Sequence, residues 1–277
     1  MRFPVPPTPR RGAARLPRWV AGALIAAAVA CADASVVQWE SERRVDGPMI
    51  PGSRLVLVGG MAPAMEAPWA PLRLPGDSLA CAETYVFARA RADTAYGAWW
   101  QRDSIGVSVA VARTPDGGIS WETLDARVRG RTAGGCERPH PAVAADSVSG
   151  QAAVAWVSDS ARRPQLVVER LTGAAPVRLV ADSAVSLGLA SLAVADSSLA
   201  VAWDAATAGA ESRGVWLAMW RGASHIRVMH SRLSAADTRA FAPSVAIGDG
   251  RIVAAWHVQN PEGRRLDTVI REGTLIR

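Results

Sequence analysis

Polar residues suited to contact a ligand stand in short segments that lead into apolar runs of the sequence. One segment is Cys81-Ala-Glu-Thr-Tyr85, another is Cys136-Glu-Arg-Pro-His140, and Arg239 stands shortly before the last apolar run. Carboxylates, guanidinium groups, an imidazole and a phenol can together hold a polar ligand through hydrogen bonds. The candidate ligand-binding residues are Glu83, Tyr85, Glu137, Arg138, His140 and Arg239. The alternative is a solvated polar rim that binds nothing.

Other patterns that could carry chemistry are weak. His140 lies near Cys136, but no cluster of four ligands with metal-site spacing is visible. His225, His230 and His257 lie apart in the sequence and are expected to be strand or edge residues. No phosphate-binding loop, dinucleotide fingerprint or Gly-x-Ser-x-Gly elbow occurs. We therefore expect neither a metal nor a cofactor.

The strands that must position the polar residues belong to a repeat. Each of four units has an apolar strand, a turn containing Asp, and a strand of small residues that ends in Trp. These closing residues are Trp100, Trp156, Trp203 and Trp256, which lie 56, 47 and 53 residues apart. A period near fifty residues is typical of a propeller or a solenoid. Continuous runs of Val, Ala and Leu indicate strands buried on both faces. We expect the four Trp to be equivalent.

Two further strands are expected in each unit. Third strands are expected at 105–112, 165–170, 215–220 and 266–270, and shorter fourth strands at 121–124, 177–180, 226–230 and 274–276. The sequence therefore predicts an all-β fold of four-stranded blades. Removing a 30-residue leader leaves 277 − 30 = 247 residues. At about fifty residues for each repeat, this length predicts a β-propeller of about five blades, and four or six also fit.

The turn from Thr114 to Trp121 carries the most specific pattern. Its sequence is Thr-Pro-Asp-Gly-Gly-Ile-Ser-Trp, in which Asp116 and Gly118 favour a tight turn between two strands. The octet resembles the Asp-box of sialidase-like (BNR/Asp-box repeat) β-propellers, and the resemblance covers roughly residues 79–277. The other units lack a clear box, so the chain resembles a degenerate member of that superfamily. The resemblance implies that Asp116 binds the turn backbone, through Gly118 or a near neighbour, and that Trp121 packs between strands.

The same resemblance implies a place and a role for the polar residues. In propellers, the segments that lead into the innermost strands line one mouth of the central channel, where ligands usually bind. In sialidases, a Glu activates a Tyr nucleophile and three Arg hold the substrate carboxylate, and the Glu, Tyr and Arg of the candidate set resemble that combination. The family's Arg-Ile-Pro signature is absent, and the chain has only two Tyr. We therefore expect a non-catalytic module that binds a glycan or an envelope protein. The alternative is an exo-acting sialidase-like glycoside hydrolase.

Cys81 and Cys136 hold equivalent places, each just before the first strand of its unit. Equivalent positions in neighbouring blades lie on the same rim. In an exported protein, we therefore expect a disulfide bond between these two residues. The alternative is two separate thiols.

The first thirty residues have the order of a secretion signal. A basic region from Arg10 to Arg18 precedes an apolar run of 12 residues, 19–30, which is short for a transmembrane helix. Ala28-Val-Ala-Cys31 resembles a bacterial lipobox with Ala28 in place of the usual Leu, so lipidation of Cys31 would anchor the protein to a membrane. The alternative is ordinary cleavage after Ala30 or Ala34. We expect export to the periplasm, the outer membrane or the cell surface.

Residues 31–78 form a Pro-rich lead-in before the repeats at 79–277. The alternating stretch Val36–Glu42 either starts a degenerate first blade or pairs with the last blade and closes the ring.

The charge of the chain argues against one class of function, nucleic-acid binding. The formal net charge is +6, but residues 1–30 hold five Arg and no acid, which leaves 26 Arg against 25 acidic residues. A nearly neutral body argues against nucleic-acid binding.

Overall fold

The computed structural model describes residues 37–45, 81, 84–102, 104, 106–124, 129–132, 135–159, 163–172, 177–183, 186–195, 197–206, 213–222, 227–259 and 266–276. The expected signal at 1–30, the lipidation site Cys31 and most of the lead-in at 31–78 lie outside these residues. Every regular element in the described ranges is a strand. None of these segments forms a helix long and apolar enough to cross a membrane.

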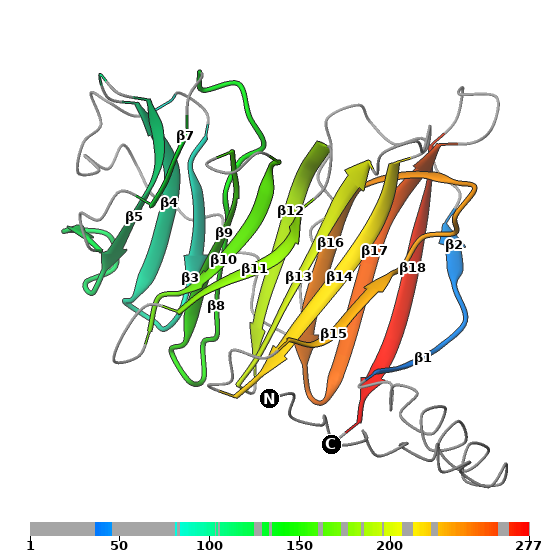
Figure 1. Cartoon of the computed structure of the whole chain (residues 1–277). Coiled ribbons are helices and arrows are strands. Elements are labelled where there is room, and N and C mark those ends of the chain that lie inside the picture. The colour runs from blue at the N-terminus through cyan, green and yellow to red at the C-terminus, as the bar shows by residue number, and fades with distance from the viewer. Residues whose placement is uncertain are drawn as a thin grey trace, which may run out of the picture. The chain divides into compact units, whose positions relative to one another are not determined.

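The described strands form four antiparallel sheets, all within the unit 36–277 (Figure 1). The first sheet contains β3 (Val86–Arg89), β4 (Ala95–Arg102), β5 (Val107–Thr114) and β6 (Glu122–Thr123), with β7 (Arg129–Thr132) also paired to β5. The second contains β8 (Ala142–Ala145), β9 (Ala152–Ser158), β10 (Gln165–Arg170) and β11 (Val177–Ser183). The third contains β12 (Ser186–Ala195), β13 (Ser198–Ala206), β14 (Arg213–Arg221) and β15 (Arg227–Arg232).

The fourth sheet joins the two ends of this unit. It contains β16 (Arg239–Gly248), β17 (Arg251–Gln259) and β18 (Leu266–Leu275), and the outer places beside β18 are taken by β1 (Val37–Trp39) and β2 (Arg43–Val45). Val37–Trp39 therefore pairs with the last sheet. Of the two alternatives for this stretch, this is pairing with the last blade and not the start of a separate first blade. Sequential strands in each sheet and four sheets in chain order are the arrangement of blades in an all-β propeller.

The expected fourth strand at 274–276 is wrong, because β18 continues without a turn to Leu275. Gly273 lies inside this continuous strand and does not form a turn. Instead, it allows close approach of the N-terminal strand, since a Cβ at this position would lie 2.5 Å from a methyl group of Val37 and 3.2 Å from the carbonyl oxygen of Gln38. The glycine therefore serves strand pairing and not a turn.

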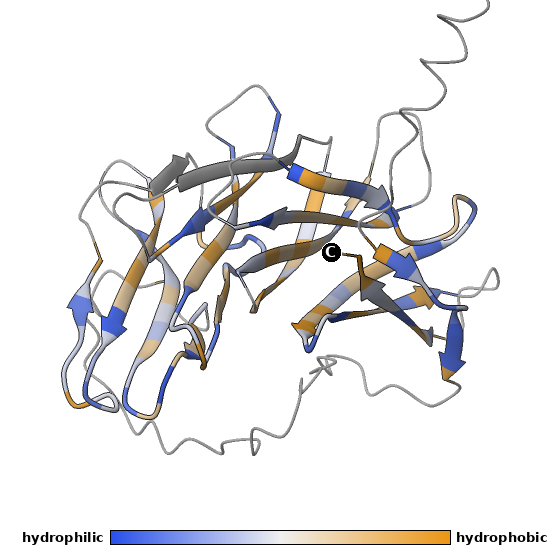
Figure 2. Cartoon of the chain, turned by 90° about the horizontal axis from the view of Figure 1, so that it is seen from below, coloured by the Kyte–Doolittle hydropathy of each residue, from blue (hydrophilic) through white to orange (hydrophobic). Residues whose placement is uncertain are grey.

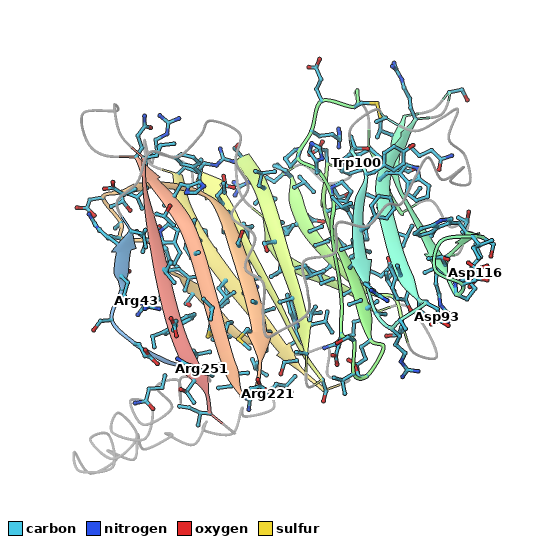
Figure 3. All side chains as sticks on the ribbon, turned by 180° about the vertical axis from the view of Figure 1, so that it is seen from behind. Arg43, Asp93, Trp100, Asp116, Arg221 and Arg251 are labelled. Carbon is cyan, nitrogen blue, oxygen red and sulfur yellow. A yellow bond between two sulfur atoms is a disulfide. The ribbon has the colours of Figure 1, made fainter. Side chains whose placement is uncertain are left out.

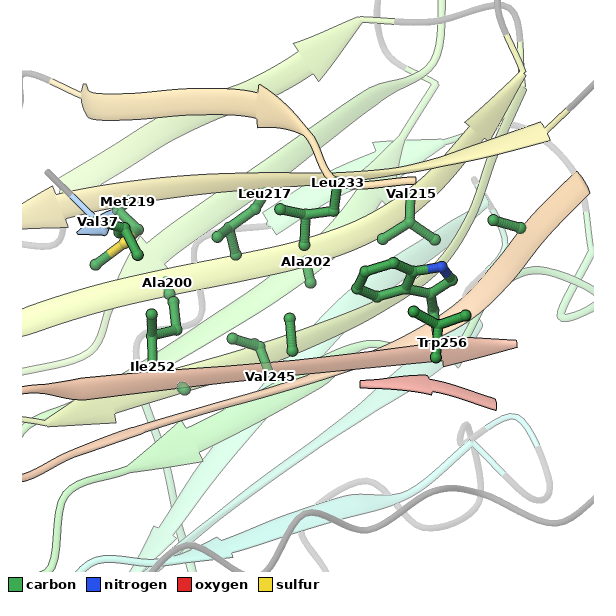
Figure 4. Packing of buried hydrophobic residues seen from close by; sticks show 14 of the residues in the cluster. Val37, Ala200, Ala202, Val215, Leu217, Met219, Leu233, Val245, Ile252 and Trp256 are labelled. Carbon is green, nitrogen blue, oxygen red and sulfur yellow. The ribbon is translucent and has the colours of Figure 1, made fainter. Parts of the chain in front are cut away.

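Apolar side chains fill the spaces between successive sheets. One cluster joins the third and fourth sheets, where Leu217 and Met219 of β14 pack with Val245, Ile252 and Trp256 (Figure 4). Similar clusters join the first sheet to the second and the second to the third. Figure 2 shows hydrophobic segments within the long strands and hydrophilic ones gathered at the turns. Burial on both faces explains why the second strands are runs of Ala and Val.

The four Trp residues predicted to be equivalent all lie in second strands, but Trp100 lies on the opposite face of its sheet from the other three. Trp156, Trp203 and Trp256 each pack in the cluster shared with the preceding sheet. Trp100 packs towards the following sheet, and Trp99 occupies the other face of β4. The hairpins explain the error: Arg89 pairs with Ala95, and Ala145 pairs with Ala152, so Trp99 and not Trp100 matches Trp156. A shift of one residue moves a side chain to the other face.

Candidate functional site

The axial rim is defined here as the end of the sheets at which the first strands β3, β8, β12 and β16 begin. Of the six candidate residues, Glu83 lies outside the described residues. Tyr85 lies directly before β3, Glu137, Arg138 and His140 lie before β8, and Arg239 begins β16. Five of the six candidate residues therefore lie in segments at the axial rim, where the first strands begin.

Tyr85 is part of an aromatic cluster on one face of the first sheet. Its ring centroid lies 5.7 Å from that of Trp99 and 6.5 Å from that of Phe87. This cluster also contains the half-buried Trp121 and two buried alanines of β5. It lies on the face of β4 opposite to Trp100, which packs towards the second sheet. Tyr85 is thus directed to the side of the first sheet that faces away from the second.

Arg138 is held on the other side. Its guanidinium group lies 5.2 Å from the centroid of the Trp100 ring, and it pairs with Asp159 at 3.0 Å. Its Nε also donates to the carbonyl oxygen of Gly135 at 3.2 Å. Only 10% of the Arg138 side chain is exposed. The charge of this arginine is therefore used to brace the segment before β8 against β4 and the end of β9.

The disulfide bond completes this brace. Cys81 and Cys136 are joined, with their Cα atoms 5.5 Å apart. The indole of Trp100 donates to the carbonyl oxygen of Pro139 at 2.9 Å, and the backbone of Cys81 pairs with that of Trp100. Thr84 caps the same loop, since its hydroxyl donates to the carbonyl oxygen of Cys81. These contacts connect the two rim segments around Trp100 (Figure 3).

The three other candidates differ in their exposure. Glu137 and Arg239 are exposed, and His140 is half-buried. Arg239 belongs to the fourth sheet, whereas Glu137 and His140 precede the second. Within the described ranges, no three His, Cys, Asp or Glu side chains gather closely enough to hold a metal ion. The described rim offers hydrogen-bonding and charged groups that are spread over several sheets.

Sequence reasoning missed one buried carboxylate near the rim. Asp204 of β13 pairs with Arg213 of β14 and accepts hydrogen bonds from the backbone amides of Leu189 and Ala242. Burial raises the pKa of the Asp204 carboxyl, and the charge of Arg213 opposes that rise. The two amides lie where the first strands of the third and fourth sheets shift register. A signal was present, because an Asp directly follows Trp203 inside an otherwise apolar strand.

His257 takes the corresponding place in the fourth sheet, directly after Trp256. Its ring lies 6.0 Å from that of Phe241, and its Nδ1 lies 3.5 Å from the hydroxyl oxygen of Thr268. Burial lowers the pKa of His257. This histidine is a packed strand residue, as the sequence predicted.

The Thr114–Trp121 turn lies between β5 and β6, away from the rim. The Asp116 carboxylate accepts hydrogen bonds from the backbone amide of Ser120 at 2.9 Å and from its hydroxyl at 2.5 Å. These bonds lower the pKa of Asp116 to about 2. The amide of Gly118 donates instead to the hydroxyl of Thr114 at 2.7 Å.

The position of this turn agrees with a structural role. Gly117 donates to the carbonyl oxygen of Asp93 in the β3–β4 turn, and Asp93 and Asp116 lie apart from Trp100 in Figure 3. The ring centroid of Trp121 lies 5.8 Å from that of Phe87. The turn thus fastens the edge of the first sheet and contributes no side chain to the rim.

No protein-family model matches the chain, and no curated protein matches it. Among solved structures, it is similar to the GH93 alpha-L-arabinofuranosidase of Fusarium graminearum, with 13% identity, a TM-score of 0.46 and coverage of 66% of this chain and 59% of that one. It is also similar to a subtype N11 neuraminidase-like protein of A/flat-faced bat/Peru (H18N11), with 9% identity, a TM-score of 0.43 and coverage of 65% and 46%. The phage phi92 endosialidase gives 10% identity, a TM-score of 0.44 and coverage of 69% and 35%. The chain spans less than two thirds of the length of these proteins, and its structural neighbours include neuraminidase-like and endosialidase proteins at low identity.

Proposed function

We propose that this protein is an exported β-propeller that binds a glycan or a protein of the cell envelope without catalysing a reaction. The binding surface is the axial rim, where Glu137, His140 and Arg239 present charged and hydrogen-bonding groups. Binding at this rim requires no nucleophile, only donors and acceptors that a polar ligand can pair.

The separation of Tyr85 from Arg138 carries this proposal. A sialidase-like hydrolase needs its tyrosine nucleophile and its carboxylate-binding arginines around one substrate. Tyr85 packs with Trp99 on one face of the first sheet, and Arg138 packs on Trp100 on the other face. Arg138 is also already paired with Asp159. This arrangement favours a binding module over the hydrolase alternative.

The disulfide bond supports the exported location. Disulfides persist in oxidising compartments such as the bacterial periplasm and the cell surface. The Cys81–Cys136 bond joins the first two sheets, and residues 1–30 have the order of a secretion signal. Intact-mass analysis of envelope material tests the location. Loss of residues 1–30 is expected, an additional acyl mass on Cys31 would indicate a lipid anchor, and an unprocessed Met1 would contradict export.

Binding is tested on glycan arrays and on purified envelope proteins with the mature chain. A double variant, Glu137→Gln with Arg239→Gln, removes two exposed charges of opposite sign and leaves the net charge unchanged. Arg89→Gln, an exposed residue at the end of β3 opposite to the rim, is the control. We expect the double variant to weaken binding at least about tenfold, or about 1.4 kcal/mol. Binding that neither variant alters would place the ligand elsewhere and contradict the proposal.

A further inference from the structure

A second polar site lies at the end of the sheets opposite to the axial rim. A pocket of about 250 Å³ opens between the β3–β4 turn of the first sheet and the β8–β9 turn of the second. The side chains that supply its chemistry are Arg91, Thr94, Tyr96, Arg113, Ser149 and Thr172. None of them belongs to the candidate rim set. The volume is small beside that of typical organic-ligand pockets, so it suits one ion or one functional group.

Two guanidinium groups give the pocket its positive charge. Arg91 donates to the carbonyl oxygen of Ser149 at 3.4 Å and lies against Gly150, where a Cβ would be 3.3 Å from the Arg91 Nε. Gly150 also has a φ of +74°. Both this left-handed conformation and the close approach of Arg91 favour glycine at this position. Arg113 has a buried Nε that no described residue accepts from. At least one strong donor therefore remains unused beside the pocket.

Tyr96 supplies an independent observation. Only 4% of this residue is exposed, and its ring packs with Ala90 and Ala152. It stands directly opposite Arg113 across β4 and β5, so the two side chains share one face. Burial raises the pKa of Tyr96, which keeps its hydroxyl protonated and able to donate. No described residue forms a hydrogen bond with that hydroxyl, and the residue lines the pocket.

Carboxylates near the pocket do not use up its donors. Glu122 pairs with Arg113 at 3.6 Å, but 58% of its side chain is exposed, so solvent weakens the attraction. The Asp146 carboxylate accepts hydrogen bonds from the backbone amides of Val148 and Ser149 at 3.0 and 3.2 Å. Its charge is therefore stabilised within the β8–β9 turn. Asp93 lies within 3.3 Å of the hydroxyl of Thr94. The hydroxyl of Ser149 also donates to Asp146, so the two guanidinium groups and the hydroxyls of Tyr96 and Thr172 remain as donors on the pocket wall.

We propose that this pocket binds a small oxyanion, such as the carboxylate or sulfate group of an acidic ligand, or inorganic sulfate or phosphate. Arg91 and Arg113 supply the charge, and the hydroxyls of Tyr96 and Thr172 supply further hydrogen bonds. Guanidinium groups pair with oxyanions through charge-assisted hydrogen bonds, which are the strongest that side chains offer. The site is independent of the proposed rim function and lies at the other end of the strands.

Isothermal titration of the mature protein with sodium sulfate, sodium phosphate and sodium glucuronate tests the site, with sodium chloride as the ionic-strength control. Saturable binding of at least one oxyanion is expected. Tighter binding of glucuronate would indicate the carboxylate of a sugar acid, and tighter binding of sulfate or phosphate would indicate the free inorganic ion. Absence of saturable binding to all three would overturn the proposal.

Variants assign the binding to this pocket. Arg91→Gln with Arg113→Gln should weaken it at least tenfold, and Tyr96→Phe, which removes only a hydroxyl, should weaken it severalfold. Arg102→Gln at the opposite end of β4 should leave it unchanged, and Glu122→Gln should strengthen it. Unchanged thermal unfolding midpoints show that the variants are folded. Binding that survives the double substitution, or that Arg102→Gln removes equally, would contradict the assignment.

Discussion

Asp204 of β13 and Arg213 of β14 form an ion pair in which only 5% of the aspartate side chain is exposed. The same carboxylate accepts hydrogen bonds from the backbones of Leu189 and Ala242, which belong to the first strands of the third and fourth sheets. A Cβ at Gly188 would lie 2.3 Å from the carboxylate, so the chain leaves room for it. One buried acid therefore connects two neighbouring sheets.

Asp204→Ala should lower the free energy of unfolding by about 3–5 kcal/mol, because it leaves a partly buried arginine and two amides without their acceptor. Asp204→Asn is the matched control, since its amide oxygen still accepts hydrogen bonds, and it should cost less. Urea unfolding measures both variants. A loss below about 0.5 kcal/mol for Asp204→Ala would show that the pair has no structural role.

Asp116 should make the turn sensitive to acid. Its pKa of about 2 in the folded state lies below the ordinary value of 3.8, chiefly because the Ser120 hydroxyl donates to it. The ionised carboxylate therefore stabilises the folded state above about pH 4, and this contribution is lost as the pH falls from about 4 towards 2. Asp116→Asn should lower the urea midpoint at about pH 6 and have little effect at about pH 2.

The exposed Asp237 provides the control for that titration. Asp237→Asn should leave the urea midpoint nearly unchanged at both pH values. If the effect of Asp116→Asn were the same at about pH 6 and about pH 2, the carboxylate would not be the stabilising group.

The Cys81–Cys136 bond closes a loop of 55 residues between the first two sheets. Loop-closure entropy assigns such a bond roughly 4 kcal/mol of stability. Replacing both cysteines with serine, or reducing the native protein, should lower the free energy of unfolding by a similar amount. Thiol titration of the oxidised, folded protein measures the bond itself. Two reactive thiols in that state would show that the bond does not form.

Gly273 should be needed for pairing of the N-terminal strand. Gly273→Val would place methyl groups where Val37 and Trp39 pack, and should therefore displace β1 from β18. Gly248→Val is the control, because no atom lies within 4 Å of a Cβ at that position. Limited proteolysis at residues 37–45 reports the displacement. Equal protection of the two variants would show that β1 tolerates the added volume.

Much of the fold follows from local patterns. Asp-containing turns and apolar runs located the first three strands of every described sheet, because strand propensity and turn chemistry are local properties. The face on which a side chain lies depends on the length of the preceding turn. The pattern around Asp93 did not reveal that length. For this reason Trp100 was predicted to be equivalent to the other three Trp, whereas the structure gives that position to Trp99. The outer strands beside β18 come from residues more than 200 positions earlier, a long-range pairing that no local signal specifies.

The candidate site was harder to predict than the fold. Tyr85 and Arg138 both lie before first strands, but whether they converge depends on the alternation of faces in β4 and on the partner Asp159. Asp204 was overlooked because the aspartates that stand out in this repeat are those of the turns. Only its burial in the structure distinguishes this strand aspartate from an exposed one. The pocket between Arg91, Tyr96 and Arg113 depends on two sheets coming together, which spacing within one unit does not show.

The proposed function requires that the protein bind its ligand without catalysing a reaction. The most direct test is hydrolysis of a fluorogenic aryl sialoside and an aryl arabinofuranoside by the mature protein, compared with Tyr85→Phe. We predict release of the fluorophore at the rate of the buffer alone for both proteins with both substrates. Turnover by the native chain that Tyr85→Phe abolishes would contradict this prediction and establish the hydrolase alternative.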